Sequence, residues 1–499
     1  MAKNIVICAD GTGNTTIKGR GTNVFKIYEA VDQNGHRNNP TLTPQIGIYH
    51  DGVGTERFRS LRLFTGATGF GLSRNVRDLY AALGRIYEPN DHIYLFGFSR
   101  GAFTIRTLAG LILTCGILDA NAYDTNEEFE QAVGRAYARY RESYQAHLAD
   151  ALAAIARSLY HPPDMPLRRT VLPEKATIRF IGVWDTVDAV GLPFRIADFI
   201  NTHLYAFKFR TTTLDKRVLC ARQALALDEE RKSFVPVLWD EQGDDSGRIQ
   251  QVWFAGVHSN VGGGYPRQGM SLVALEWMMK EAFSCGLRFN DGEREHYYTH
   301  RDVNDKLYDP RSGAGILYRW QPRNVEALCR AARVKTILVH RSAFERIARN
   351  TEGYVPGSIP RAFKVVSSSL DGADCERIEA TVSAAYGGSP SLPELSRIDL
   401  RRGQLSYRSF VAAIGLLAVV GIGLCIATWA GRADAARALR HPLITVAGAV
   451  LLAASYVLHL WTDHTLDRTH SRFWHKVREP LRVALGIHRA EVTDLTRVA

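Results

Sequence analysis

A serine stands between two glycines in the segment Gly97-Phe98-Ser99-Arg100-Gly101, a GxSxG pattern. The apolar run 92–96 precedes it, and residues 102–113 have the apolar spacing of a helix. A serine at such a strand–turn–helix junction is typical of a nucleophile elbow, in which the glycines relieve crowding around a sharp turn. The pattern predicts a serine nucleophile for acyl transfer, with the helix N-terminus close to the developing oxyanion.

A serine hydroxyl needs a base to activate it, and the base needs an acid to orient it. Two apolar strands downstream of Ser99 end in titratable residues: the run 177–184 leads into Asp185, and the run 250–257 leads into His258. The chain order serine, aspartate, histidine is that of α/β-hydrolase triads. We therefore expect Ser99 as the nucleophile, Asp185 as the acid and His258 as the base.

Other residues remain open for the same roles. Asp188 lies three residues beyond Asp185 and is an alternative acid. His203 and His340 also follow the serine, but neither ends so clear a strand, and a structural role is the better interpretation of both.

The oxyanion formed by acyl transfer needs two N–H donors. The residue after the nucleophile, Arg100, supplies one in such elbows, and a loop after an earlier strand supplies the other. Gly11 and Thr12 are our candidates, because the turn 10–14 follows the apolar run 3–9. This turn lacks the lysine of a GxxxxGK[ST] loop, which disfavours nucleotide binding. Its alternative role is simply to close the first strand.

The composition indicates no cofactor and no metal site. The seven cysteines are scattered, without a CxxC pair, and we interpret them as free thiols in a reducing compartment. Asp10 and Asp51 each follow an expected strand, and we interpret them as solvated turn residues rather than metal ligands.

The elements that would position these residues alternate between strand and helix. A helix is expected over residues 73–87, before the strand 92–96 and the helix 102–113, and this order is typical of a parallel α/β sheet. Ligands bind at the carboxyl edge of such sheets. We expect one catalytic domain over residues 1–395. Its segment 119–175 is a helical insertion that forms either a cap over the site or surface helices.

The end of the chain is of a different kind. Residues 410–430 contain no charged side chain, and residues 442–461 contain only His459 as a titratable group. Each run approaches the roughly 20 apolar residues that cross a bilayer. We expect residues 396–499 to form a transmembrane helical hairpin followed by a basic tail. Phe473 and Trp474 of that tail are expected in the headgroup layer.

Charge suggests both a partner and an orientation. The formal net charge is +11, without a basic-aromatic module of a nucleic-acid-binding kind, so we expect a phospholipid membrane and no nucleic acid as partner. The start of the chain does not have the pattern of a signal peptide. Basic residues that flank the apolar runs outnumber those of the loop 431–441. This asymmetry predicts a multi-pass protein of the cytoplasmic membrane with its catalytic domain in the cytoplasm.

Five segments in a fixed order carry a family resemblance. They are Asp10-Gly-Thr-Gly-Asn14, Gly97-Phe-Ser-Arg-Gly-Ala102, Val183-Trp-Asp-Thr-Val187, Ala224-Leu-Ala-Leu-Asp-Glu229 and Trp253-Phe-Ala-Gly-Val-His-Ser-Asn-Val-Gly-Gly-Gly-Tyr265. Residues 1–365 resemble the catalytic domain of type VI secretion phospholipase effectors. The resemblance implies an α/β-hydrolase fold, phospholipid ester hydrolysis, and the roles assigned above to Ser99, Asp185 and His258. The chain departs from the family at Asn260, where aspartate is common, and at Gln223, where histidine is common.

The sequence therefore favours a membrane-anchored serine phospholipase that damages membranes as an antibacterial or phage-defence effector. A non-catalytic membrane scaffold on a hydrolase fold and a hydrolase of small esters or peptides are the alternatives. The sequence leaves open a regulatory or delivery protein, the lipid head group, the acyl position, the trigger and the oligomeric state.

Overall fold

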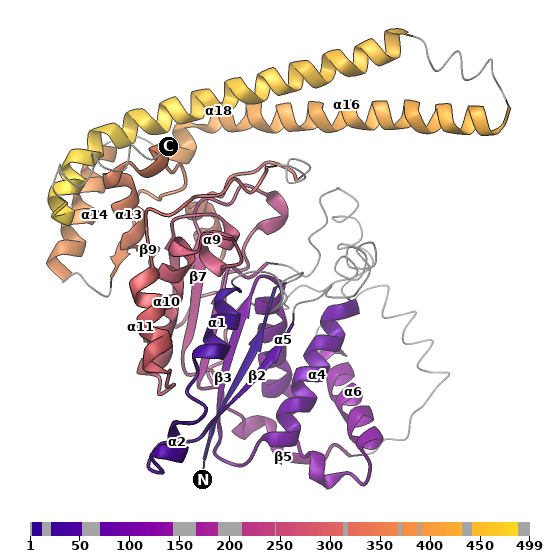
Figure 1. Ribbon diagram of the computed structural model, residues 1–499, viewed down its shortest axis with the longest axis vertical. Helices are drawn as coiled ribbons and strands as arrows, with labels where there is room; N and C mark the ends of the chain where they lie inside the picture. The colour runs from indigo at the N-terminus through magenta and orange to yellow at the C-terminus, as the bar shows by residue number, and fades with distance from the viewer. Residues whose placement is uncertain are drawn as a thin grey trace.

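A parallel β-sheet forms the centre of the catalytic region (Figure 1). The computed structural model describes residues 2–11, 21–51, 70–142, 166–187, 212–244, 246–312, 318–367, 372–387, 391–431 and 442–487. The eight strands run in the order β10-β9-β8-β7-β6-β3-β1-β2, and each neighbouring pair is parallel. Their bounds are β1 Asn4–Ala9, β2 Gln45–His50, β3 His92–Phe98, β6 Phe180–Trp184, β7 Ala221–Ala226, β8 Ile249–Phe254, β9 Leu338–His340 and β10 Lys364–Val366. The predicted α/β class with a parallel sheet is confirmed.

Helices cover both faces of this sheet, and two long helices, α16 and α18, follow them near the end of the chain. Their bounds are α1 Asn23–Ala30, α2 Gly35–Asn38, α4 Phe70–Ile86, α5 Arg100–Cys115, α6 Asn126–Glu142, α9 His258–Gly262, α10 Gly269–Ser284, α11 Asp291–His300, α12 Val325–Ala331, α13 Arg341–Arg349, α14 Gly372–Tyr386, α15 Leu392–Leu395, α16 Arg397–Trp429 and α18 Pro442–Leu485. Alternate residues of β1 point to opposite faces. Ile5 and Ile7 pack with α4, α5 and α6, whereas Val6 and Cys8 pack with α1 and α10.

The segment 119–175 is described only in part. A two-stranded antiparallel sheet pairs β4, Ile117–Leu118, with β5, Arg169–Val171, and α6 lies between them in sequence. Phe129, Val133 and Tyr140 of α6 are buried in the core that α4 and α5 also form. This helix therefore packs beside the sheet's helical layer. Residues 143–165 lie outside the described residues, so a cap remains a prediction.

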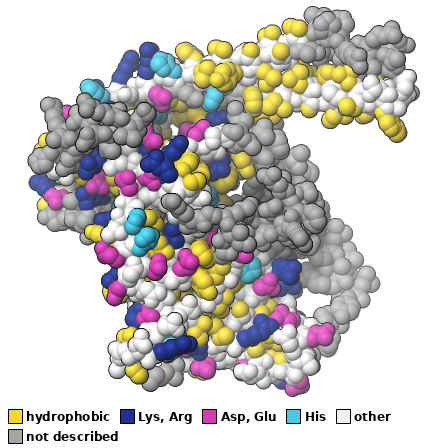
Figure 2. Space-filling view, viewed as in Figure 1, with side chains coloured by type: hydrophobic (Ala, Val, Ile, Leu, Met, Phe, Trp, Pro, Cys, Tyr) yellow, Lys and Arg dark blue, Asp and Glu magenta, His cyan; other side chains and the backbone are white. Residues whose placement is uncertain are grey.

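Two long helices, α16 and α18, form an antiparallel hairpin that projects from the catalytic region (Figure 1). Both are long and apolar enough to cross a membrane, and only 17% and 18% of their most apolar windows are buried within the protein. Figure 2 shows hydrophobic side chains along the projecting hairpin. Small residues bring the two helices close, since the Ser406 hydroxyl donates to the Ser455 carbonyl oxygen at 2.7 Å. The length, apolar composition and exposure of these two helices support association of the protein with a membrane.

The last part of α18 packs on the catalytic region, which corrects one expectation. Trp474 is fully buried, and its indole N–H donates to the carbonyl oxygen of Pro356 at 2.8 Å. Phe473 packs on Tyr386 of α14, with 4.5 Å between ring centroids. The prediction that Phe473 and Trp474 face lipid headgroups was wrong, because both rings complete an apolar core with α13 and α14.

Candidate active site

Ser99 lies at a strained turn between β3 and α5. Its φ of 58° and ψ of −123° are unusual for a residue with a side chain. A Cβ on Gly97 would lie 2.7 Å from the Ala102 Cα, and one on Gly101 would collide with the carbonyl oxygens of Ala9 and Asp10. Only glycine therefore allows the turn to close against the end of β1. This geometry is that expected of a nucleophile elbow.

The predicted acid and base are in direct contact. Asp185 follows β6, and His258 follows β8 and begins α9. His258 Nδ1 and Asp185 Oδ2 are 2.6 Å apart, which assigns the ring proton to Nδ1. The opposite nitrogen, Nε2, is buried and has no hydrogen-bond partner among the described residues. The ring can therefore accept a proton at Nε2 while Asp185 holds its other side.

The carboxyl ends of neighbouring strands bring the serine to the same place. The Ser99 N–H donates to the Trp184 carbonyl oxygen at 3.0 Å, next to Asp185 in sequence. Phe98, the residue before the serine, packs on the His258 ring with 4.6 Å between centroids. Ser99 Oγ forms no hydrogen bond with Nε2 in this structure. Such bonds commonly tighten only when substrate binds.

A second partner of the acid, Arg323, was not predicted. It lies just before α12, and its two terminal nitrogens donate to Asp185 Oδ1 and Oδ2 at 2.7 and 2.8 Å. The same guanidinium donates to the carbonyl oxygen of Ala226 at 2.6 Å. Asp185 Oδ1 also accepts the Ala226 N–H at 3.1 Å. Because the Ala226 N–H and the Arg323 guanidinium both donate hydrogen bonds to the Asp185 carboxylate, this group has little freedom to rotate.

Electrostatics favour an ionised acid beside a neutral base. Burial alone would raise the pKa of Asp185, but Arg323 and His258 outweigh burial and hold that pKa well below its usual range. Burial lowers the pKa of His258 below its ordinary 6.5, although Asp185 opposes this shift. A charged carboxylate thus faces an imidazole that is unprotonated at neutral pH, which is the state a general base requires.

Glu229 and Arg231 form a second ion pair beside the histidine. Glu229 accepts from the Arg231 Nε at 2.7 Å and from the His258 backbone N–H at 3.3 Å. Arg231 stacks over Phe234, whose ring meets the His258 ring edge-on with 5.0 Å between centroids. The histidine is therefore fixed from its backbone as well as from its ring.

The structure describes two of the three candidate oxyanion donors, Arg100 and Gly11. Arg100 begins α5, so its N–H lies at the positive end of that helix. The Gly11 N–H donates to Asp10 Oδ1 at 2.6 Å and would have to be released to serve an oxyanion. Thr12 lies outside the described residues. Asp10 is buried and also accepts from Thr22 and Tyr49, so its interpretation as a solvated turn residue was wrong, whereas Asp51 is exposed as expected.

Of the three alternative residues, His340 alone lies in the described part of the chain. Asp188 and His203 lie outside the described residues. His340 is buried at the start of α13, where it caps the N–H of Ser342 and stacks on Phe254. No group of three or more metal-binding side chains occurs in the described part of the chain.

The two departures from the family pattern support neighbouring loops. Asn260 donates to the Lys306 carbonyl oxygen at 3.0 Å. Gln223 accepts from the Thr186 hydroxyl at 2.6 Å and donates to Gln251 at 3.0 Å. Gln223 thereby holds the side chain of Thr186, the residue after Asp185, and forms no hydrogen bond with the acid itself.

This chain is similar to a curated protein in sequence and to a solved structure. An uncharacterized protein of Saccharomyces cerevisiae, YEL023C, is 26% identical over 246 residues, which are 46% of this chain and 32% of the yeast protein. The chain thus spans about a third of the length of that relative. The crystal structure of an uncharacterized protein from Pseudomonas aeruginosa aligns with 77% of this chain and 58% of its own, at 18% identity and a TM-score of 0.31.

Residues 3–281 match the family described as "T6SS, phospholipase effector Tle1-like, catalytic domain". This span is more than half of the chain and contains Ser99, Asp185 and His258. The chain belongs to the Tle1-like phospholipase effector family of type VI secretion.

Proposed function

We propose that this protein is a membrane-anchored serine esterase that hydrolyses the acyl esters of phospholipids through Ser99, His258 and Asp185, on an α/β-hydrolase fold. One observation carries the proposal: the 2.6 Å bond between His258 and Asp185 leaves a buried Nε2 that has no partner among the described residues, on a ring that packs against Phe98, the residue before Ser99. A histidine with a purely structural role would be expected to use both ring nitrogens when buried.

The proposed reaction has two acyl-transfer steps. His258 Nε2 takes the Ser99 hydroxyl proton as the oxygen attacks the ester carbonyl, and a tetrahedral oxyanion forms. The C–O bond to the glycerol breaks as the imidazolium returns the proton to the leaving oxygen, which gives a lysolipid and an acylated serine. Water, deprotonated by the same nitrogen, then releases the fatty acid.

Two features would lower the barrier. Asp185, held ionised by Arg323, stabilises the imidazolium that forms in each step. The Arg100 N–H at the α5 terminus stabilises the oxyanion, and the turn at Gly11 and Thr12 is the proposed source of a second donor. Removal of one such donor typically costs about 100- to 1000-fold in kcat.

The α16–α18 hairpin, inserted in a bilayer, would keep the Ser99 site close to its phospholipid substrate. A helix rises 1.5 Å per residue, so twenty apolar residues of α16 extend about 30 Å, the thickness of a bilayer core. Trp429 at the far end of α16 is 91% exposed, as suits an aromatic side chain in an interface layer. The basic residues that flank the apolar runs support a catalytic region on the cytoplasmic side. Cleavage of that region by external protease in spheroplasts would contradict this orientation.

The products suggest the biological use. Fatty acid and lysolipid disturb bilayer packing, so sustained turnover would damage the membrane in which the enzyme sits. We propose an effector of antibacterial or phage-defence type. The trigger and any delivery partner are separate questions.

Vesicle hydrolysis tests the proposal. The full chain and Ser99→Ala are incubated with mixed-phospholipid vesicles, and products are identified by mass spectrometry. We expect free fatty acid and lysolipid from the wild type alone. Turnover of a short-chain ester without any phospholipid product would instead indicate a small-ester hydrolase, and no turnover of either would favour a non-catalytic scaffold.

A further inference from the structure

Two cysteines from distant parts of the chain meet where α10 packs on β7. Cys220 directly precedes β7, and Cys285 directly follows α10. The two side chains are hydrogen-bonded to each other, and both cysteines are free thiols. The proposed hydrolysis uses neither of them, so this pair is a second chemical feature of the molecule.

A neighbouring ion pair shows how the two elements hold the thiols together. Cys220 already joins the sheet, since its carbonyl oxygen accepts the Ile181 N–H at 2.9 Å. Arg222, two residues later, points to the same face of the extended chain. Glu281 lies four residues before Cys285, one turn earlier along α10. Because Arg222 Nε donates to Glu281 at 2.5 Å, the ion pair and the thiol pair are successive contacts between one face of the strand and one face of the helix.

The two thiols have different surroundings. Cys285 is partly exposed, whereas Cys220 is 7% exposed. The hydrogen bond from Cys220, together with Arg222 and Arg179, lowers the pKa of Cys285 although burial opposes the shift. The same hydrogen bond and burial raise the pKa of Cys220. A partly exposed thiol that ionises easily, beside a second thiol, is the arrangement expected of an attacking cysteine with its resolving partner.

The other five cysteines differ from this pair. Burial raises the pKa of Cys8, Cys115 and Cys329, which disfavours the reactive thiolate at each. Cys375 is partly exposed, and Cys425 is exposed on the projecting hairpin. An oxidant in solution should therefore react first at the pair.

We propose that Cys220 and Cys285 form a modification site at which hydrogen peroxide produces a reversible disulfide. The Cys285 thiolate attacks one peroxide oxygen and the O–O bond breaks, which leaves a sulfenic acid and a hydroxide that takes a proton to become water. The Cys220 sulfur then attacks the Cys285 sulfur, and the S–O bond breaks as hydroxide leaves with the Cys220 proton as a second water. The two thiols lose two electrons, and one peroxide is reduced to two waters.

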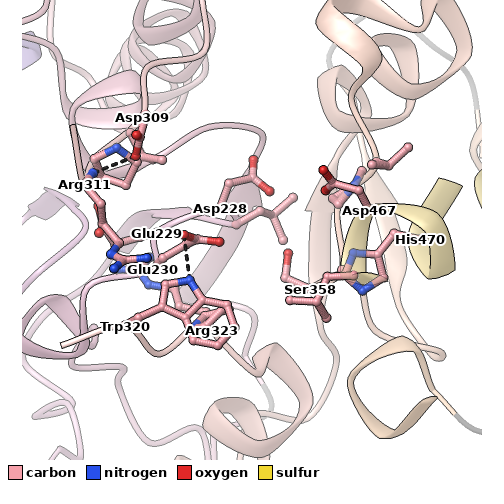
Figure 3. A pocket seen from close by; sticks show the side chains of 18 of the residues that line it. Asp228, Glu229, Glu230, Asp309, Arg311, Trp320, Arg323, Ser358, Asp467 and His470 are labelled. Carbon is pink, nitrogen blue, oxygen red and sulfur yellow. Dashed lines mark hydrogen bonds between the residues drawn. The ribbon is translucent and has the colours of Figure 1, made fainter. Parts of the chain in front are cut away.

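The disulfide would act on stability rather than on the reaction centre. It would link the ends of the segment 220–285, which contains β7, β8, α9 and α10, and hold α10 on the sheet. The pair precedes β7, whereas Asp185 and His258 follow the carboxyl ends of their strands. A cavity of about 830 Å³ beside Glu229 and Arg323 (Figure 3) likewise has no cysteine among the described residues that line it. The inference therefore does not depend on the proposed function.

Peptide mapping of the full-length protein in detergent tests this modification. Reduced protein is treated with hydrogen peroxide, the remaining thiols are alkylated with N-ethylmaleimide, and the peptides are analysed without reduction. We expect a Cys220 peptide linked to a Cys285 peptide, and dithiothreitol should release both. Separate alkylation of the two cysteines after peroxide treatment, or linkage of either one to another cysteine, would overturn the proposal.

Trapping the sulfenic acid tests which thiol reacts first. In Cys220→Ser, which keeps a hydroxyl donor beside Cys285, dimedone should label Cys285 after peroxide treatment. In Cys285→Ser, dimedone should label Cys220 at least tenfold more slowly. Cys375→Ser is the matched control for a partly exposed thiol and should form the disulfide as the wild type does. Equal labelling rates in the first two variants would contradict the assignment of Cys285 as the attacking thiol.

Thermal unfolding gives a separate readout of the cross-link. The oxidised wild type should unfold roughly 5 °C above the reduced protein, because the cross-link restricts the unfolded chain. Dithiothreitol should reverse this shift, and peroxide should produce no such shift in Cys220→Ser or Cys285→Ser. Equal midpoints for the linked and the reduced wild type would refute the effect on stability.

Discussion

At the scale of single residues, the proposed chemistry depends on the protonation of His258. Its pKa lies below 6.5, chiefly because it is buried, and the protonated ring cannot act as a base. Activity should therefore rise with pH as the ring loses its proton. We expect a plot of log kcat/KM against pH, for a soluble ester, to rise with unit slope to a midpoint below pH 6.5 and then level off. A midpoint at pH 7 or above would contradict this description of the base.

Arg323 gives a second prediction at this scale. Arg323→Leu leaves Asp185 buried with one fewer cation, which should lower the free energy of unfolding by about 3–5 kcal/mol. The uncompensated carboxylate also favours protonated His258, so the acid limb of the pH profile should move to higher pH. Unfolding and pH–rate measurements on Arg323→Leu, Arg323→Lys and the exposed neighbour Arg330→Leu test this. Arg323→Lys should recover part of the activity, and an acid limb that stays in place in Arg323→Leu would contradict the role.

The sequence predicts the contact between Asp185 and His258, because each follows an apolar strand and parallel strands end at one edge. Arg323 could not be predicted in the same way. It lies 138 residues from Asp185, in a loop without periodicity, and it is one of many arginines. Only the packing of that loop against the carboxyl edge of the sheet reveals its role.

At the scale of elements, the mostly apolar strands were predictable, and the polar or very short ones were not. β1, β3, β6 and β8 are short apolar runs beside turns. β7 is central, yet it contains Arg222 and Gln223, whose polar side chains are satisfied by neighbours rather than by solvent. β9 and β10 have three residues each, too few for a pattern.

The docking of α18 leads to a prediction about stability. Trp474 is fully buried against the catalytic region, so Trp474→Ala should leave a large cavity and lower the free energy of unfolding by about 3–5 kcal/mol. Trp429→Ala is the matched control, since that ring is 91% exposed. Thermal unfolding in detergent compares the two variants. Equal midpoints would mean that the end of α18 is not part of the folded core.

At the scale of the whole molecule, two apolar runs predicted the hairpin, but composition did not reveal that α18 continues as one helix to Leu485. Aromatic residues among basic ones have the pattern of an interfacial tail. Only the tertiary contacts with α13 and α14 show that this segment is instead a helix packed on the catalytic region. The hairpin is therefore joined to the catalytic region by a continuous helix. The direction in which the hairpin projects is therefore fixed relative to the candidate active site.

Membrane association can be tested on the hairpin itself. Ile422 is 60% exposed in the middle of the apolar part of α16, and a lysine there should cost about 2.5–3.5 kcal/mol of insertion free energy. Ile398 is 64% exposed on the same helix but precedes the apolar run. We expect Ile422→Lys, and more so its combination with Val450→Lys, to reduce the fraction that sediments with membranes. Ile398→Lys should behave as the wild type, and equal sedimentation of all variants would argue against a spanning hairpin.

The central claim is that Ser99 is a nucleophile activated by His258, and covalent labelling tests it most directly. The full chain is treated with a fluorophosphonate, and the modified residue is located by peptide mass spectrometry. We expect one adduct, on Ser99, in the wild type, with no adduct in Ser99→Ala and strongly slowed labelling in His258→Ala. An adduct on another residue, or labelling of Ser99→Ala at the wild-type rate, would contradict the account.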